Sequence, residues 1–101
     1  MSEANTGEIL EIPVGEIGPG PLVRAERLDF DHVARLRPVL DLVPPILVRE
    51  TGKGWSLVDG AHRLAATKKE ERETIRAVVR AMEDAEALEA AIEANISHGL
   101  A

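Results

Sequence analysis

Cysteine and tyrosine are absent from this sequence of 101 residues, and it contains one tryptophan and one phenylalanine. Without cysteine the chain can form neither a disulfide scaffold nor a cysteine zinc site, and it has no thiol nucleophile. This composition suits a reducing compartment, so we predict a cytoplasmic protein. No run of about 18 apolar residues is present, which argues against a membrane-spanning helix, and residues 1–12 lack the pattern of a signal peptide.

Positive charge is also scarce, since 12 Lys and Arg stand against 18 Asp and Glu and give a net charge of −6. Such a balance argues against binding nucleic acid through charge alone. The charge is unevenly distributed, however. Residues 49–80 contain eight basic and five acidic residues and carry a net +3, while the rest of the chain carries −9. An anionic ligand is therefore expected in the middle third of the chain.

The length of the chain suits one domain with a single two-layer core. Residues 1–7 are polar and lack periodicity, so we predict a disordered N-terminus followed by one domain over residues 8–101. A β-like segment over residues 9–17 precedes a loop rich in Gly and Pro. Asp29 is an N-cap candidate, and the apolar spacing that follows predicts a helix that Pro38 ends one turn early.

The second half of the chain predicts a hairpin, two helices and one more strand. Apolar runs at residues 46–48 and 55–58 flank a glycine-containing turn, a helix is predicted from residue 61, and residues 74–79 read as a strand. Asp84 is predicted to cap a last helix whose core-facing stripe consists of Ala85, Leu88, Ala91 and Ile92. The order β, α, β, β, α, β, α indicates an α+β fold, a small mixed sheet packed with about three helices.

The strongest candidate site is the run from Asp59 to Arg63, where a predicted strand gives way to a helix. A helix N-terminus presents backbone N–H groups, and Gly60 lets a ligand approach the backbone closely. Arg63 can bind phosphate oxygens with its forked guanidinium, and His62 can donate hydrogen bonds or move a proton. The pattern indicates a phosphate site. An ordinary Asp-Gly turn followed by a surface arginine has the same pattern, so both interpretations stay open.

A second candidate lies at the end of the last helix. Asn95 continues the predicted stripe and His98 follows one turn later, where a core-facing polar group requires a partner. The alternative is that these residues only terminate the helix. Arg24 either reaches the same site or is a surface residue, and His32 is expected to face solvent. The sequence contains no metal-binding motif such as HExxH.

Taken in order, these segments resemble the ParB/sulfiredoxin-like domain over about residues 8–100. The resemblance is carried by IPVGEI, PPILVRE, LVDGAHRLAA and AIEANISHGL. In ParB proteins a Gly-Glu-Arg-Arg box at the strand-helix turn and a Glu-Asn-x-x-Arg box in a late helix bind the phosphates of CTP. Gly60 and Arg63 match the first box, with Ala61 in place of its Glu and His62 in place of its first Arg.

The second box is matched by Asn95, with Ala94 in place of its Glu and His98 in place of its Arg. That Glu is associated with Mg²⁺ and hydrolysis in the family, so Ala94 counts against CTP hydrolysis. Sulfiredoxin carries Gly-Cys-His-Arg at the turn, and the missing thiol at Ala61 excludes its reductase activity. The endings VDGAHRL and ANISHGL are most like those of StrR-type regulators of antibiotic biosynthesis, in which a helix-turn-helix segment follows. Because this sequence stops at Ala101, the resemblance implies either part of a longer regulator or a stand-alone domain.

The resemblance implies a nucleotide- or phosphate-binding regulatory module of a DNA-associated protein, of the transcription-regulation or DNA-partitioning type. Contacts with DNA are expected outside these residues, no membrane contact is expected, and a homodimer remains open. The expected ligand is CTP or another nucleotide with Mg²⁺, held by Gly60, Ala61, His62, Arg63, Asn95, His98 and Arg24, with no metal site of the protein's own.

Two further hypotheses stay open on the sequence alone. One is a ParB-like enzyme that uses the same phosphate site, as a CTP- or ATP-dependent hydrolase, a small-molecule kinase or a nuclease. His62 and Asp59 are then the candidate catalytic residues. The other is a protein-interaction domain that keeps the fold without the ligand.

Overall fold

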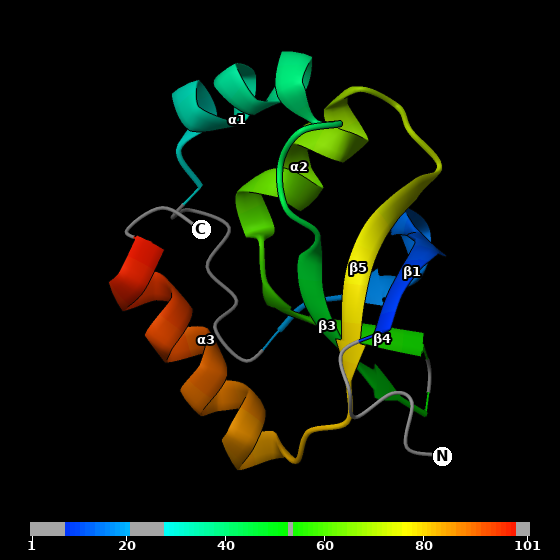
Figure 1. Ribbon diagram of the computed structural model, residues 1–101, viewed down its shortest axis with the longest axis vertical. Helices are drawn as coiled ribbons and strands as arrows, with labels where there is room; N and C mark the ends of the chain where they lie inside the picture. The colour runs from blue at the N-terminus through cyan, green and yellow to red at the C-terminus, as the bar shows by residue number, and fades with distance from the viewer. Residues whose placement is uncertain (1–7, 21–27, 53, 99–101) are drawn as a thin grey trace.

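The structure, a computed structural model, describes residues 8–20, 28–52 and 54–98. Its strands form one sheet with the order β1-β5-β3-β4-β2 (Figure 1). The strands are β1 (Glu8–Pro13), β2 (Ile17–Gly18), β3 (Ile46–Thr51), β4 (Gly54–Asp59) and β5 (Thr74–Arg80). β3 pairs with β5 in parallel and with β4 in antiparallel, so the sheet is mixed.

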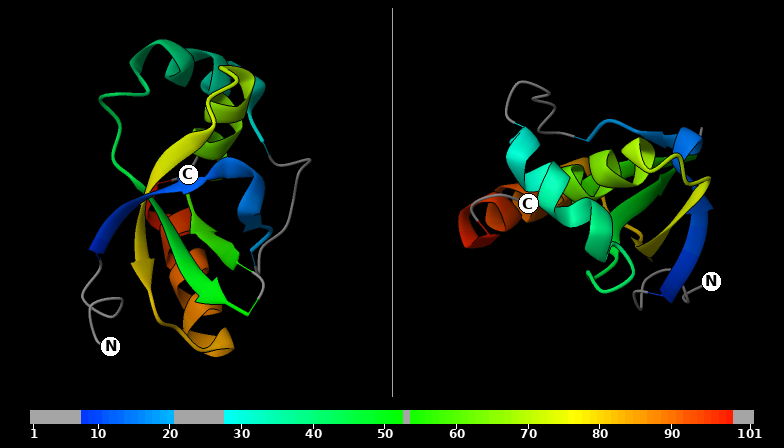
Figure 2. Two further views of the ribbon diagram at one scale, coloured as in Figure 1. Left: turned by 90° about the vertical axis from the view of Figure 1, so that its right-hand side faces the viewer. Right: turned by 90° about the horizontal axis from the view of Figure 1, so that it is seen from above.

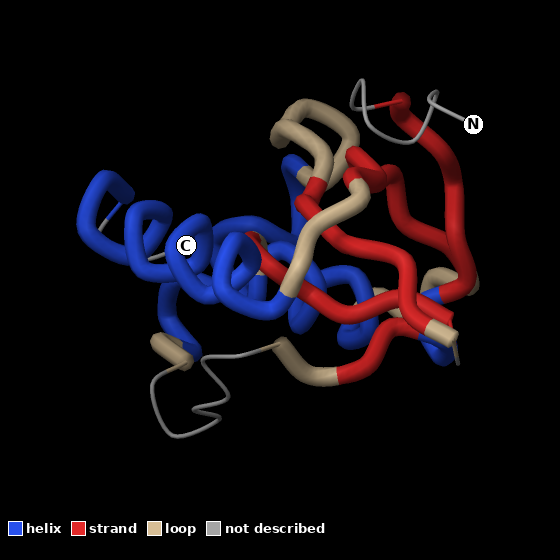
Figure 3. The backbone as a smooth tube through the Cα atoms, turned by 90° about the horizontal axis from the view of Figure 1, so that it is seen from below, coloured by secondary structure: helices blue, strands red, loops and turns tan. Residues whose placement is uncertain are grey.

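The described residues form three α-helices: α2 (Ala61–Lys69) and α3 (Asp84–His98) pack on the sheet, and α1 (Phe30–Leu36) packs on α2. Short 3₁₀ turns occupy Val14–Glu16 and Arg37–Val39. Figure 2 shows α1 and α2 together at one end of the molecule, with α3 at the other, and Figure 3 shows the strands grouped beside the helices. The predicted α+β fold, a small mixed sheet with three helices, is confirmed.

The alternation of side chains along β3 assigns the two faces of the sheet. Ile46 and Val48 point to one face, where a cluster contains Ile12, Ile17, Ile46, Val48, Leu64, Ala77 and Val79 and includes one residue of α2. Leu47 points to the opposite face and packs with Val58 and the alanines of α3. The helices therefore cover both faces, and α1 packs outside α2 through Val33, Leu40 and Ala66.

The predicted hairpin is confirmed, because β3 and β4 pair in antiparallel from Thr51 and Gly54 onward. The predicted early end of the first helix is confirmed as well. α1 stops at Leu36, and the chain continues as a 3₁₀ turn that contains Pro38. The Asp29 carboxylate caps α1 by accepting backbone N–H groups of the next turn at 3.0 and 3.3 Å.

The predicted core-facing stripe of α3 is wrong in part. Leu88 and Ile92 are 40% and 42% exposed, whereas Ala87 and Ala91 are buried. The buried alanines pack on Val58 of β4. Small side chains let the helix backbone approach the sheet closely, so the alanines and not the larger residues mark the packed face.

The predicted cap of α3 is displaced by one residue. Asp84 is the first residue of the helix, and its carboxylate accepts a hydrogen bond from Arg49 Nη2 at 2.8 Å. The backbone N–H of Glu83 donates instead to the side chain of Glu86 at 2.9 Å, as in a capping box. Arg49 also donates to the carbonyl of Met82 at 3.1 Å and so fixes the entry into α3.

Candidate functional site

The turn from β4 into α2 is shaped by Gly60. This residue has φ +115° and ψ 32°, a left-handed conformation that favours glycine. A Cβ atom there would lie 2.5 Å from Ile46 Cγ2, so a side chain would also collide with β3. Because this N-cap residue is a glycine, it has no side chain of its own to cap α2. The first backbone N–H groups of α2 therefore form an arrangement that favours an anion.

His62, in the first turn of α2, is buried with 5% exposure. Its Nε2 accepts a hydrogen bond from the backbone N–H of Asp29 at 2.9 Å. Since Nε2 is the acceptor, the proton of the neutral ring lies on Nδ1. The side chain thus joins the start of α2 to the start of α1.

The prediction that His32 faces solvent is wrong, because its ring is half-buried and packs edge to face on the ring of His62, with centroids 5.0 Å apart. Burial lowers the pKa of His32 below its ordinary value, and the electrostatic effects of His62 and Arg35 lower the pKa further. The carboxylate of Asp29 opposes this shift. The surroundings of His32 therefore favour its neutral form.

Arg63 connects the turn to the segment before β3. Its Nη1 donates to the carbonyls of Pro44 and Pro45 at 3.0 and 2.8 Å, and its Nη2 lies 3.5 Å from Asp59 Oδ2. The side chains of Arg63 and Asp59 are only 13% and 16% exposed. The guanidinium is thus fixed behind the first turn of α2, where its charge is poorly screened by water.

The other predicted site residues are described to different extents. Ala61 is the first residue of α2 and is half-buried. Asn95 and His98 lie in the last turns of α3, but their side chains, like the whole of Arg24, are outside the described part of the chain. In Figure 1 the start of α1, the first turn of α2 and the C-terminal end of α3 lie on the same side of the molecule.

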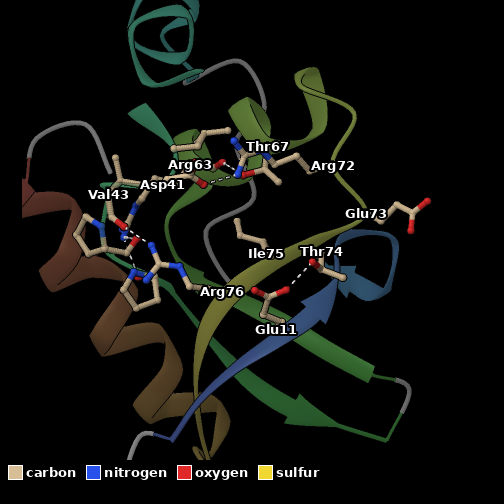
Figure 4. A pocket seen from close by; sticks show the side chains of 13 residues that line it. Glu11, Asp41, Val43, Arg63, Thr67, Arg72, Glu73, Thr74, Ile75 and Arg76 are labelled. Atoms are coloured by element: carbon tan, nitrogen blue, oxygen red, sulfur yellow. Dashed lines mark hydrogen bonds and ion pairs between the residues drawn. The ribbon is translucent and has the colours of Figure 1, made fainter. Parts of the chain in front are cut away.

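A separate pocket of about 480 Å³ runs along the flank of α2 (Figure 4). Its walls are residues 40, 41 and 43–45 after α1, the α2 face that carries Arg63 and Thr67, residues 72–76 at the start of β5, and Glu11 of β1. Arg72 Nη1 donates to Asp41 Oδ1 at 2.9 Å, and Arg76 Nη2 donates to the carbonyl of Val43 at 2.8 Å. The hydrogen bond and charge of Arg72 lower the pKa of the Asp41 carboxyl.

Reasoning from sequence missed the contacts made by Asp29 and His32 and the pocket lined by Arg72 and Arg76. Asp29 was identifiable as a cap, but nothing in the sequence shows that its N–H meets a side chain 33 residues away. The two arginines contribute to the basic middle third, which is the one signal that pointed to them. Over the described ranges, no group of three or more His, Cys, Asp or Glu is arranged to hold a metal ion.

Comparison with known proteins identifies the family. Residues 1–96 match the model of the ParB N-terminal domain, and the chain belongs to this family. It is 33% identical over 101 residues to a possible regulatory protein of the streptomycin biosynthesis operon of Streptomyces griseus, covering 98% of this chain and 28% of that protein. It is 31% identical over 91 residues to the chromosome-partitioning protein Spo0J of Thermus thermophilus, covering 87% of this chain and 34% of that protein.

Solved structures agree with this assignment. The fold is similar to the C-terminally truncated chromosome-partitioning protein ParB of Caulobacter crescentus complexed with CTP-gamma-S, with a TM-score of 0.72, 26% identity and coverage of 90% of this chain and 54% of that one. It is also similar to sulfiredoxin of Arabidopsis thaliana, with a TM-score of 0.68, 30% identity and coverage of 84% and 97%. The predicted membership of the ParB/sulfiredoxin-like fold is confirmed.

The chain spans about a third of the length of these curated relatives. Among the helices that the structure describes, none has the length and apolar character needed to cross a membrane.

Proposed function

We propose that this domain binds the phosphate groups of a nucleotide, CTP in the first place, at the first turn of α2, and acts as a regulatory module of a DNA-associated protein. The observation that carries the proposal is the start of α2, where the N-cap residue is Gly60, which has no side chain and adopts the left-handed conformation. A ParB of the same fold was crystallised with CTP-gamma-S. The names of the relatives, a chromosome-partitioning and a possible regulatory protein, support a DNA-associated role.

The roles of the site residues follow from their contacts. The backbone N–H groups that follow Gly60 would hold phosphate oxygens, because a helix start favours negative charge. Arg63 would act mainly through its field, since its guanidinium is held by Pro44, Pro45 and Asp59. His62 would position α1 beside the turn through its hydrogen bond from Asp29.

Asn95, His98 and Arg24 are proposed to complete the site from the end of α3 and from the loop before α1. In Figure 1 these ends lie on the same side of the molecule, which supports a ligand that extends from one helix to the other. Mg²⁺ would be brought by the phosphates, which supply oxygen ligands of the kind it prefers. DNA would be contacted by other parts of the whole protein.

Isothermal titration calorimetry with CTP, ATP, GTP and UTP, each with and without Mg²⁺, tests this proposal. We expect saturable binding of at least one nucleotide, with a Kd below about 1 mM. Asn95→Ala should weaken that binding by about tenfold, the usual value of one hydrogen bond to a charged group. Glu93→Ala, an exposed change two residues earlier on α3, is the matched control and should leave the Kd unchanged. Absence of binding by all four nucleotides up to millimolar concentration would contradict the proposal.

A phosphate-release assay on the same samples separates a binding module from an enzyme. We expect no release above background at saturating nucleotide and Mg²⁺. Turnover that disappears in Asp59→Asn or in His62→Gln, while binding persists, would instead support a hydrolase that uses this turn. If the protein binds none of the nucleotides and releases no phosphate, the protein-interaction hypothesis is favoured.

A further inference from the structure

The pocket along α2 combines available guanidinium donors with an apolar wall. Arg72 uses only Nη1 and Arg76 only Nη2 in contacts with the described residues, so the other N–H groups of both side chains have no protein acceptor there. Arg63, by contrast, donates to two carbonyls and faces Asp59. Two of the three arginines that line the pocket can therefore bind an added acceptor.

The negative groups of the pocket do not neutralise these donors. Asp41 alone pairs with Arg72, and its side chain is 83% exposed on a turn. The Glu11 carboxylate accepts from the Thr74 hydroxyl at 2.8 Å. In Figure 4 the side chain of Glu73 points away from the cluster formed by Arg63, Arg72 and Asp41. Of the three carboxylates that line the pocket, only Asp41 contacts Arg72 or Arg76, so Arg76 has no acidic partner among the described residues.

Beside these polar groups and Thr67, the lining also includes apolar side chains: Leu40, Val43, Pro44, Pro45 and Ile75. Figure 4 shows Ile75 between Arg72 and Arg76. A compact, strongly hydrated anion gains nothing from such a surface, whereas an apolar body buried there is stabilised by transfer from water. The volume of about 480 Å³ also lies within the range of about 300–1,000 Å³ that is usual for small-molecule sites.

We propose that this pocket binds a small organic carboxylate with an apolar body. The carboxylate lies between Arg72 and Arg76, and the body packs on Val43, Pro44 and Ile75. The pair between Arg72 and Asp41 already shows a carboxylate held at one of the two donors, and a guanidinium matches this planar group through forked hydrogen bonds. Arg63 lines the pocket from the first turn of α2, but it is held by Pro44, Pro45 and Asp59. The proposed ligand contacts Arg72 and Arg76 instead, so the inference does not depend on nucleotide binding.

A ¹⁵N NMR titration with sodium benzoate tests the proposal, with benzamide as the neutral analogue of the same shape and inorganic phosphate as an anion without an apolar body. We expect saturable shifts of backbone amides over residues 40–45 and 72–76. Benzamide and phosphate should bind at least about tenfold more weakly, because each lacks one of the two recognised parts. No saturable shift with benzoate, or equal shifts with benzamide, would overturn the proposal.

Three substitutions assign the contacts. Arg76→Gln should weaken benzoate binding by about tenfold, whereas Arg80→Gln, an exposed arginine on the same strand outside the pocket, should not change it. Asp41→Asn should strengthen binding a few-fold, because it removes the internal carboxylate that competes for Arg72. The amide spectrum of each variant reports whether it is folded. Equal weakening in Arg76→Gln and Arg80→Gln, or weaker binding in Asp41→Asn, would contradict the assignment.

Discussion

At Gly60 two constraints act on one residue. The backbone is left-handed at φ +115°, and the space where a Cβ would lie is filled by Ile46. The conformation of Gly60 sets the direction in which α2 leaves β4. That direction determines where the first backbone N–H groups of the helix point. The sequence pattern suggested that Gly60 lets a ligand approach the backbone. The structure shows that the turn itself requires a glycine at this position.

Gly60→Ala should therefore destabilise the fold by about 2–4 kcal/mol, from backbone strain together with overpacking. Gly52→Ala is the matched control, because no atom lies within 4 Å of its added Cβ, and its cost should stay below about 1 kcal/mol. Urea unfolding followed by the fluorescence of Trp55 measures both. Similar losses in the two variants would show that the turn at residue 60 tolerates a side chain.

The lowered pKa of His32 makes the free energy of unfolding depend on pH. Burial of His32 lowers its pKa in the folded state, so the unfolded chain binds more protons near and below its ordinary value of about 6.5. The contribution of His32 to the free energy of unfolding is complete above about pH 6.5. It is lost as the pH falls below 6.5 towards the lower pKa that His32 has in the folded state. We expect the free energy of unfolding to fall between pH 7.5 and pH 5, and to fall less steeply in His32→Gln. Urea unfolding at several pH values measures the slopes, and parallel curves for the two proteins would contradict this account.

At the scale of elements, α3 is placed by its smallest side chains. Ala87 and Ala91 lie on the sheet, and Arg49 ties the start of the helix to β3 through the Met82 carbonyl and Asp84. This placement carries the C-terminal end of α3, with Asn95, to the side of the molecule where α2 begins (Figure 1). The distance between the start of α2 and the C-terminal end of α3 therefore depends on close packing at the alanines.

Ala91→Leu should lower the free energy of unfolding by about 1–3 kcal/mol through overpacking against β4. Ile92→Ala, one residue later and 42% exposed, should lower it by less than about 1 kcal/mol. Thermal unfolding of the two variants gives the comparison. If Ile92→Ala is the more damaging change, the helix packs by the face that the larger apolar residues mark, and the described packing is incorrect.

The elements that depend on local signals were predictable from the sequence. The β3–β4 hairpin follows from two apolar runs around a glycine turn, and the end of α1 follows from Pro38. The packed face of α3 was not predictable, because hydrophobicity alone favours Leu88 and Ile92 as buried residues. The buried residues are alanines, whose small side chains let the helix approach the sheet closely. The link between His62 and Asp29 and the pocket formed by Asp41, Arg72 and Arg76 join residues about 30 positions apart, and no local pattern encodes such pairs.

For the whole molecule, the net charge is −6, but the arginines of the middle third make contacts within the protein. The basic middle third contains β3, β4, α2 and β5, and four of its arginines tie one element to another: Arg49, Arg63, Arg72 and Arg76. Three of these arginines, Arg49, Arg63 and Arg72, also pair with carboxylates, so much of this positive charge is used within the protein. That arrangement suits an anionic ligand better than an extended nucleic-acid surface, which requires a broad patch of exposed cations.

The central claim is that a nucleotide binds at the first turn of α2, and a ¹⁵N NMR titration with CTP and Mg²⁺ tests it most directly. The account predicts that the largest saturable shifts occur at the amides of residues 60–63 and in the last turns of α3. Residues 72–76, in the separate pocket, should shift little. Saturable shifts confined to that pocket, or no saturable shift at residues 60–63, would contradict the account.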